Sequence, residues 1–160
     1  MSEIGLVRVD SRLLHGQVVT RWIGQVNARE VIIFDDDLAK DEFMIEVFQM
    51  AAPSGVNLIV KSVGEAPEYL AERDLKHSIV LFKNIPMLLK VMKANTTIER
   101  IQIGGIGGGP DRVGVFKNIT LTKDEYQSLK ELNTKGISIY LQTVPEEREV
   151  KLSDISNKFN

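Results

Sequence analysis

The sequence of 160 residues contains no cysteine. A disulfide scaffold, a thiolate zinc site and a cysteine nucleophile are therefore excluded. It also has no excess of positive charge, because 20 Lys and Arg residues stand against 22 Asp and Glu residues. A protein that grips nucleic acid through its phosphates needs a basic surface, so no nucleic-acid partner is predicted. Histidine occurs only twice, which leaves few candidates for imidazole chemistry.

Long apolar runs are also missing. Apolar residues make up 43% of the chain, but they occur in runs of a few residues, far short of the ~20 that a membrane-spanning helix needs. The N-terminus has no basic segment before an apolar stretch, so we expect no secretory signal peptide and a cytoplasmic protein. The length is typical of one domain, and no repeat or linker-like segment interrupts it. We therefore expect a single domain over residues 1–160.

Short β-branched runs alternate with helical stretches along the chain, a pattern typical of an α/β protein. It predicts a doubly wound, mainly parallel sheet with helices on both faces. Strands are predicted at 4–9, 31–34, 57–61, 78–82, 100–103, 119–121 and 137–142, and helices at 16–22, 39–52, 67–72, 86–93 and 122–132. In such a sheet, ligands bind beyond the carboxyl ends of the strands. Helical spacing further predicts a buried core position for Trp22, Phe43, Met44, Val47, Phe48, Ala51 and Tyr126.

The segment after the first strand is the strongest candidate site. Arg8 is a charged residue within an apolar strand, Asp10 lies at the strand end, and Arg12 and His15 follow near the start of a helix. The N-terminus of a helix favours an anion, and arginine adds bidentate contacts to phosphate. A histidine in such a place can act as acid, base or nucleophile. The structural alternative is a surface turn in which Asp10 pairs with Arg12.

Two other patterns favour structural interpretations. The glycine-rich segment 104–110 lacks the Lys-Ser/Thr of a P-loop, and Pro110 stands where a dinucleotide fingerprint needs glycine, so no nucleotide site is predicted. The run from Asp35 to Asp37 could bind magnesium, but helix capping by Asp37 or Asp41 is the favoured interpretation. We therefore expect neither a metal nor a cofactor.

The string from Arg8 to Val18, followed by Thr20-Arg21-Trp22, resembles a specific phosphorylation-site signature. It is similar to that of the IIB component of the bacterial sugar phosphotransferase system (PTS), in the mannose/fructose/sorbose class. The rest of the chain fits this family in its length and its strand–helix alternation. It also fits in the residues that follow three strands, which are Asp36, Lys83-Asn84 and Gly104-Gly105.

The resemblance implies a phosphoryl relay at the cytoplasmic side of a membrane transporter. A phosphohistidine of a IIA component would phosphorylate His15, on Nδ1, and His15 would pass the group to a sugar held by membrane IIC and IID components. Arg12 would contact the phosphoryl oxygens, Asp10 would orient His15 or Arg12, and Arg8 would support the loop from inside the strand. The residues expected in the substrate and phosphate site are Arg8, Gly16, Gln17, Asp36, Lys83, Asn84, Gly104 and Gly105. Segment 141–146 resembles the N-acetylgalactosamine branch, while the sugar and any homo-oligomer stay open.

Two other functions compete with this interpretation. One is a response-regulator-like signalling domain with a phosphoaspartate among Asp35–Asp37. It would need an acceptor carboxylate after the third strand, where the chain reads Ser62-Val63-Gly64. The other is a non-catalytic α/β domain that holds a free anion at Arg8 and Arg12.

Overall fold

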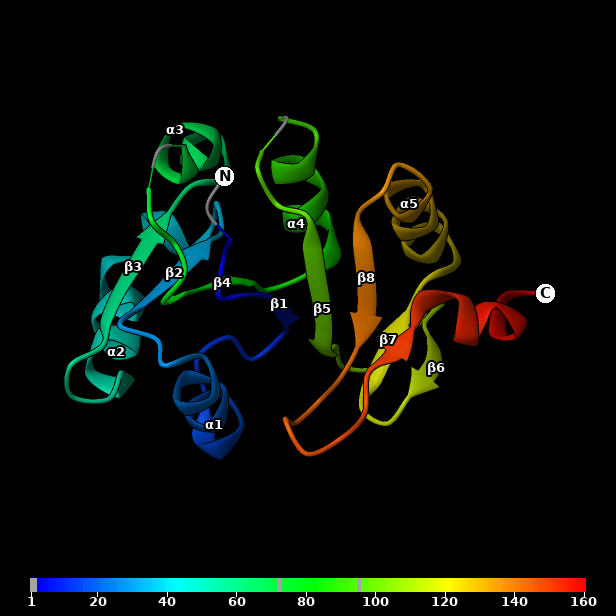
Figure 1. Ribbon diagram of the computed structural model, residues 1–160, viewed down its shortest axis with the longest axis horizontal. Helices are drawn as coiled ribbons and strands as arrows, with labels where there is room; N and C mark the ends of the chain where they lie inside the picture. Colours follow the sequence, from blue (N-terminus) through cyan, green and yellow to red (C-terminus); the bar gives the residue numbers. More distant parts are fainter. Residues whose placement is uncertain (1–2, 72, 95) are drawn as a thin grey trace.

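The computed structural model describes residues 3–71, 73–94 and 96–160, without the side chains of 17–19. Its main sheet has seven strands in the order β3-β2-β4-β1-β5-β8-β9. The first six strands in this order run parallel, and β9 pairs antiparallel with β8 (Figure 1). The strands are β1 (Leu6–Asp10), β2 (Glu30–Phe34), β3 (Asn57–Lys61), β4 (Ser78–Phe82), β5 (Arg100–Gly105), β8 (Ser138–Leu141) and β9 (Val150–Lys151).

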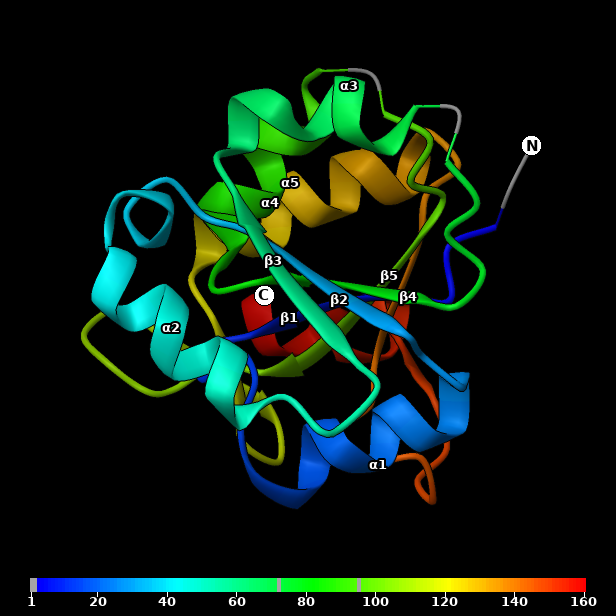
Figure 2. The same cartoon turned by 90° about the vertical axis from the view of Figure 1, so that its left-hand side faces the viewer.

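Helices cover both faces of this sheet, which confirms the predicted doubly wound α/β fold (Figures 1 and 2). On one face lie α3 (Ala66–Leu70), α4 (Ile85–Met92) and α5 (Lys123–Thr134). On the other lie α1 (Gly16–Val26) and α2 (Glu42–Ala51). The described residues also form the 3₁₀ helices η1 (Leu38–Lys40), η2 (Val63–Glu65) and η3 (Leu152–Phe159). Each face has its own apolar cluster, because strands buried on both sides carry apolar residues at successive positions.

Alternation along β1 decides where its polar residues point. Val7 and Val9 belong to the apolar cluster under α3, α4 and α5, whereas Leu6 belongs to the cluster under α1. Successive side chains of a strand point to opposite faces. Arg8 therefore shares the α1 face with Leu6, where its guanidinium lies 5.5 Å from the ring centroid of Trp22.

Most predicted elements are confirmed, some to the residue. The strands at 57–61, 78–82 and 119–121 have the predicted bounds. Asn84 caps α4, and Thr122 and Glu125 form the predicted capping box of α5. The first strand was placed too early, since β1 extends to Asp10. Residue 72, the predicted end of the third helix, lies outside the described residues.

The prediction for helix 39–52 is wrong in two respects. The segment divides into η1 and α2, because the Asp41 side chain accepts a hydrogen bond from the Met44 N–H and begins a new helix. Phe43, Val47 and Ala51, predicted to be buried, are exposed, while Met44 and Phe48 pack against the core. The helix covers the edge of the sheet, so only one of its sides has a neighbour (Figure 2).

Some elements that pair locally are not predicted by the sequence. The strand β6 (Val113–Phe116) forms an antiparallel hairpin with β7 (Ile119–Leu121), and Lys117 in its turn has a positive φ of 45°. β9 and η3 were missed as well. β6 has four residues and β9 has two, too few for an alternating pattern to mark a strand from sequence.

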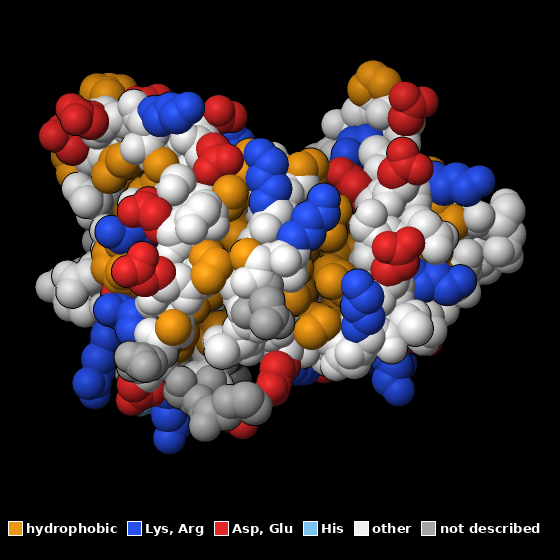
Figure 3. Space-filling model, turned by 90° about the horizontal axis from the view of Figure 1, so that it is seen from above, with side chains coloured by type: hydrophobic (Ala, Val, Ile, Leu, Met, Phe, Trp, Pro, Cys, Tyr) orange, Lys and Arg blue, Asp and Glu red, His pale blue; other side chains and the backbone are white. Residues whose placement is uncertain are grey.

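Over α3, α4 and α5, the acidic and basic side chains of the described residues intermix on the surface (Figure 3). Among the described residues, no helix is both long and apolar enough to span a bilayer.

Candidate active site

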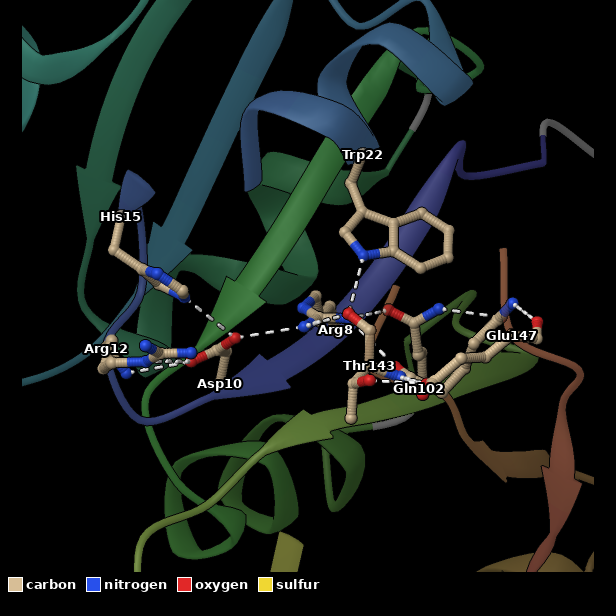
Figure 4. A network of polar contacts seen from close by, with 9 residues as sticks. Arg8, Asp10, Arg12, His15, Trp22, Gln102, Thr143 and Glu147 are labelled. Carbon is tan, nitrogen blue, oxygen red and sulfur yellow. Dashed lines mark hydrogen bonds and ion pairs between the residues drawn. The ribbon is translucent and has the colours of Figure 1, made fainter. Parts of the chain in front are cut away.

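Asp10 is the last residue of β1, between the carboxyl ends of β4 and β5, and its side chain is completely buried. Its carboxylate is the meeting point of three cationic or polar residues (Figure 4). Oδ2 lies 3.2 Å from Nε2 of His15 and accepts a hydrogen bond from Nη2 of Arg8 at 3.1 Å. Oδ1 accepts the backbone N–H of Arg12 at 3.0 Å, and the Arg12 Nε lies 3.9 Å away.

The loop between β1 and α1 is fixed at several points. The N–H of Leu13 donates to the Asp10 carbonyl at 2.9 Å, closing a turn in which Leu13 has a positive φ of 55°. The Ser11 N–H donates to the Gly105 carbonyl at 2.8 Å and ties the loop to β5. Leu13 and Leu14 are buried in the cluster under α1. Apolar burial offsets the strain of the left-handed residue, and the loop holds His15 in one place.

His15 occupies the N-cap position of α1 in an extended conformation, and its side chain makes no capping hydrogen bond. The side chain is 17% exposed, with Nε2 directed at Asp10. Gly16 follows with a positive φ of 40°, which glycine adopts without strain. The first N–H groups of a helix have no partner within the helix, so they and the helix dipole favour an anion here.

Arg8 lies beneath Asp10 and is only 1% exposed. Besides Asp10, its guanidinium donates to the Gln102 side chain and to the carbonyls of Gln142 and Thr143. Burial lowers the pKa of Arg8 from its ordinary value, and the Asp10 charge opposes that effect. This buried position does not bring Arg8 to the surface where a phosphoryl group would arrive, contrary to its place in the predicted phosphate site.

A bulge in β5 makes room for this arginine. The pairing of β1 with β5 shifts register between Val9 and Asp10, which leaves Gly104 without a partner. A Cβ added at Gly104 would lie 2.0 Å from Cζ of Arg8, whereas one at Gly105 would lie 3.4 Å from the Asp10 carboxylate. Both predicted glycines therefore adjoin the site from below, and both are buried. Gly104 fits because any other side chain would occupy the space of the guanidinium.

Arg12 differs from Arg8 in that its side chain is 57% exposed. It lines a cavity of about 270 Å³ between the β1–α1 loop and the segment that leads into α2. Lys83, at the end of β4, lines the same cavity, so the structure brings these two cations to one side of the site. The walls also include Asp35, Asp37 and Asp41.

The remaining predicted site residues are Asp36, Asn84 and Gln17. Asp36 accepts the Val63 N–H at 2.9 Å and pairs with Lys90, and these contacts lower the pKa of its carboxyl group, the Val63 hydrogen bond most strongly. Asn84 accepts the Met87 N–H at 3.0 Å as the cap of α4. Gln17 has its backbone in the first turn of α1, and its side chain lies outside the described residues.

Four residues that support the site were missed as site residues. The Gln102 side chain accepts a hydrogen bond from the Arg8 guanidinium, and Trp22 donates its Nε1–H to the Thr143 carbonyl at 3.2 Å (Figure 4). Glu147 accepts hydrogen bonds from both the backbone N–H and the hydroxyl of Thr143. Gln102 could have been found from the sequence, because it is a polar residue between Ile101 and Ile103 in a buried strand. Arg8 stands out in the same way in β1. The contacts of Thr143 with Arg8 and Trp22 pass through its backbone carbonyl, which no side-chain pattern reveals.

Within the described residues, no group of three or more His, Asp or Glu side chains is placed to hold a metal ion. The acidic run after β2 serves structure in part. Asp35 accepts the Leu38 N–H at 2.8 Å, and Asp41, not Asp37, supplies the cap of α2.

Comparison with known proteins gives one family over nearly the whole chain. The family described as PTS system sorbose subfamily IIB component matches residues 4–160. The sorbose-specific EIIB component of Klebsiella pneumoniae is 31% identical over 162 residues, covering 98% of this chain and 96% of that protein. The mannose-specific EIIAB component of Escherichia coli (strain K12) is 28% identical over 163 residues, covering 98% of this chain. The alignment covers 49% of that protein, so this chain spans about half its length.

Solved structures agree with the sequence matches. The crystal structure of manxB from Thermoanaerobacter tengcongensis superimposes with a TM-score of 0.89 at 36% identity. The match covers 99% of this chain and 98% of that one. The fold and the family are therefore found together over the same residues.

Proposed function

This chain belongs to the sorbose subfamily of PTS IIB components, and we propose that its His15 carries a phosphoryl group toward a sugar. The donor would be the phosphohistidine of a IIA component, and the acceptor a sugar held by membrane IIC and IID components at the cytoplasmic face. The whole chain would act as one IIB domain. The sugar would be of the mannose, fructose, sorbose or N-acetylgalactosamine type.

The contact between Asp10 and His15 is the observation that carries this proposal. A carboxylate only accepts hydrogen bonds, so its contact with Nε2 favours the tautomer that has its proton there. The lone pair then lies on Nδ1, which becomes the nucleophile. Asp10 would thus orient the ring and select the reacting nitrogen.

The chemistry needs charge stabilisation more than any further reacting group. The Nδ1 lone pair forms the new N–P bond while the N–P bond to the donor imidazole breaks and its electron pair returns to that ring. Positive charge develops on the His15 ring, next to the Asp10 carboxylate. Negative charge on the phosphoryl oxygens would meet Arg12, the N–H groups that begin at Gly16 and the Lys83 ammonium.

In the second transfer, to the sugar, the His15 imidazole is the leaving group. A sugar hydroxyl attacks phosphorus, the Nδ1–P bond breaks with its electrons returning to His15, and the hydroxyl proton passes to water. Arg8 would take no direct part. It would act as a positioning residue, because it holds the Asp10 carboxylate that orients His15.

Two of the three aspartates after β2 have hydrogen-bond partners, which argues against a phosphoaspartate at those two positions. Asp35 is engaged with the Leu38 N–H and Asp36 with Val63 and Lys90. Ser62 forms a capping box with Glu65 at the end of β3, where a response regulator would need its acceptor carboxylate. A free-anion site remains the alternative to a relay, and it predicts no covalent adduct.

Phosphorylation of the purified protein decides between these functions. Incubation with phosphoenolpyruvate, the general PTS proteins and a IIA component should add one phosphate that is acid-labile and base-stable. His15→Ala should abolish the adduct, as read by intact-mass spectrometry, and leave the thermal melt unchanged because His15 lies in a loop. His77→Ala is the matched control, since it removes the only other histidine. Full labelling of His15→Ala would move the acceptor elsewhere.

A further inference from the structure

The outward side of α2 exposes three large apolar side chains. Phe43, Val47 and Met50 are 73%, 40% and 85% exposed, and their spacing of four and three residues puts them on one side of the helix. We call these three residues the α2 stripe. The opposite side of the helix packs against the apolar core under α1. A contiguous exposed apolar patch of this kind marks an interaction surface on a soluble protein.

Negative charge surrounds the α2 stripe. Residues 37–50 contain four acidic residues and a single lysine, Lys40. Two of the acidic residues, Glu42 and Glu46, are exposed on α2 itself, and Asp37 and Asp41 are exposed just before it. Such a rim slows association with an acidic partner and favours a basic one. The partner must therefore present an apolar segment flanked by Lys or Arg.

On the basis of the function proposed above, we propose that the α2 stripe docks a cytoplasmic loop of the membrane component that holds the sugar. Cytoplasmic loops of membrane proteins carry an excess of Lys and Arg, which complements this rim. The bare membrane is a poor occupant, because the anionic lipids of its cytoplasmic leaflet would repel the same acidic residues.

The α2 stripe adjoins the site that the loop must reach. Met44 and Phe48, on the inner side of α2, line the cavity that Arg12 and Lys83 also line. α2 follows β2 at the carboxyl edge of the sheet, the edge at which Asp10 ends β1. Figure 2 shows it along the β3 edge, on the face that α1 also covers. A loop seated on α2 could therefore extend over the cavity toward His15.

The relay gives a reason for a contact beside His15. The IIA donor and the sugar-holding component must each reach the same imidazole in turn, so both share its immediate surroundings. A surface set to one side can bind one partner without the other. The α2 stripe would thus raise affinity for the membrane component and leave the encounter with IIA unaffected.

Two half-reactions measured separately test this assignment. We would compare the parent protein with the double variant Phe43→Gln/Met50→Gln. The first assay is phosphorylation of His15 by phosphorylated IIA. The second is sugar phosphorylation by inverted vesicles containing IIC and IID, with the purified phosphoprotein as donor. We expect an unchanged first rate and a rise of roughly tenfold in the KM for the phosphoprotein in the second.

Matched variants separate apolar contact from charge. Val113→Gln removes a comparable exposed apolar side chain on β6 and should change neither half-reaction. Glu42→Lys/Glu46→Lys reverses the rim and should raise the same KM at low salt, with a smaller effect at high salt. Glu68→Lys/Glu131→Lys, at exposed positions of α3 and α5, makes the same change in net charge away from α2 and is its control.

Each contrary result has a defined meaning. An unchanged KM in the vesicle assay overturns the docking proposal and leaves the relay intact. A loss in the first half-reaction alone assigns the α2 stripe to IIA, and an equal loss in both half-reactions shows no preference for the membrane component, so either result also overturns the proposal. Dissociation of a dimer by the double variant, in sedimentation at equal concentration, would assign the stripe to a second copy. If the parent protein accepts no phosphate at His15, the proposed function itself is refuted.

Discussion

Asp10 separates two regions of the molecule that use arginine in different ways. Below it, Arg8 is 1% exposed and donates to Asp10, Gln102 and two backbone carbonyls. Above it, Arg12 is 57% exposed and its guanidinium only approaches the carboxylate, at 3.9 Å. We call Arg8 with Gln102, Gln142, Thr143 and Glu147 the buried layer, and residues 11–15 the exposed loop.

The difference shows how one carboxylate serves both rigidity and exchange. A buried charge is costly unless it is paired and hydrogen-bonded, so Asp10 and Arg8 hold each other in one geometry. An exposed arginine keeps its hydration and its rotamer freedom, so it can turn to an incoming group at little cost. The buried layer thus fixes where the imidazole points, and the exposed loop remains available to the phosphoryl group.

Removing the buried arginine should have the largest effect. Arg8→Met leaves the Asp10 carboxylate without its buried partner, and we expect a loss of about 3–5 kcal/mol in the free energy of unfolding. Arg12→Met, the matched control, should lose less than about 1 kcal/mol because its pairing is exposed. Urea unfolding followed by circular dichroism measures both. Equal losses would remove the distinction between the two regions.

Filling the bulge should disturb the buried layer without touching a charge. A Cβ at Gly104 would lie 2.0 Å from Cζ of Arg8, so Gly104→Ala should cost about 2–3 kcal/mol of stability. Gly108→Ala is the control, because a Cβ there has no neighbour within 4 Å, and it should stay within about 0.5 kcal/mol. Thermal melts of the two variants test the pair. A Gly104→Ala protein as stable as the parent would mean that Arg8 has room to move.

Changing the exposed arginine should affect rate and spare stability. Arg12→Lys keeps the charge but loses the planar fork, so we expect transfer to slow by roughly ten- to a hundredfold, or about 1–3 kcal/mol. The melting temperature should not change, since the side chain is exposed. Rapid-quench measurement of phosphoryl transfer from IIA gives the rate. Transfer at the parent rate would leave charge stabilisation to the helix N–H groups and Lys83.

Acid should weaken the buried layer through Glu147. Burial raises the pKa of the Glu147 carboxyl, but hydrogen bonds from Lys117 and Thr143 outweigh it and lower the pKa from 4.5 to about 2. A depressed folded pKa stabilises the protein above the unfolded value of 4.5, and this stability is lost as pH falls toward about 2. The free energy of unfolding of the parent should exceed that of Glu147→Gln by about 1–2 kcal/mol near pH 6, after allowance for screening.

The measurement is unfolding of both proteins by urea at several pH values. The gap in the free energy of unfolding should shrink below pH 4.5, within the window set by the folded and unfolded pKa values. A gap that is independent of pH would show that the contact matters through packing and not through charge. Glu146→Gln, at an exposed neighbouring position, is the control.

The sequence predicted the region of the site better than the partners within it. The order of residues in segment 8–16 indicated a loop at a strand end with His15 at the start of a helix, and the structure has this arrangement. Asp10 was expected to orient His15 or Arg12, but nothing in the sequence indicated that its carboxylate also meets Arg8. Nor could the sequence place Gln102 or Thr143 beside Arg8, because these residues are 94 and 135 positions away along the chain.

The miss on α2 has a similar origin. The spacing of apolar residues gave the helix, but both of its sides carry apolar residues, so periodicity could not say which side is buried. The side was decided by the position of α2 over the edge of the sheet, where one side has no neighbour.

The sequence by itself determined the alternation of strands and helices, the caps of α4 and α5, and the residue types gathered after β1. These depend on near neighbours in the chain, through periodicity and capping hydrogen bonds. Only the tertiary structure decided that Arg8 lies under Asp10 and Arg12 above it. That choice depends on the order of strands in the sheet, which sets β5 and its bulge at Gly104 beside β1 and leaves the guanidinium a single place to fit.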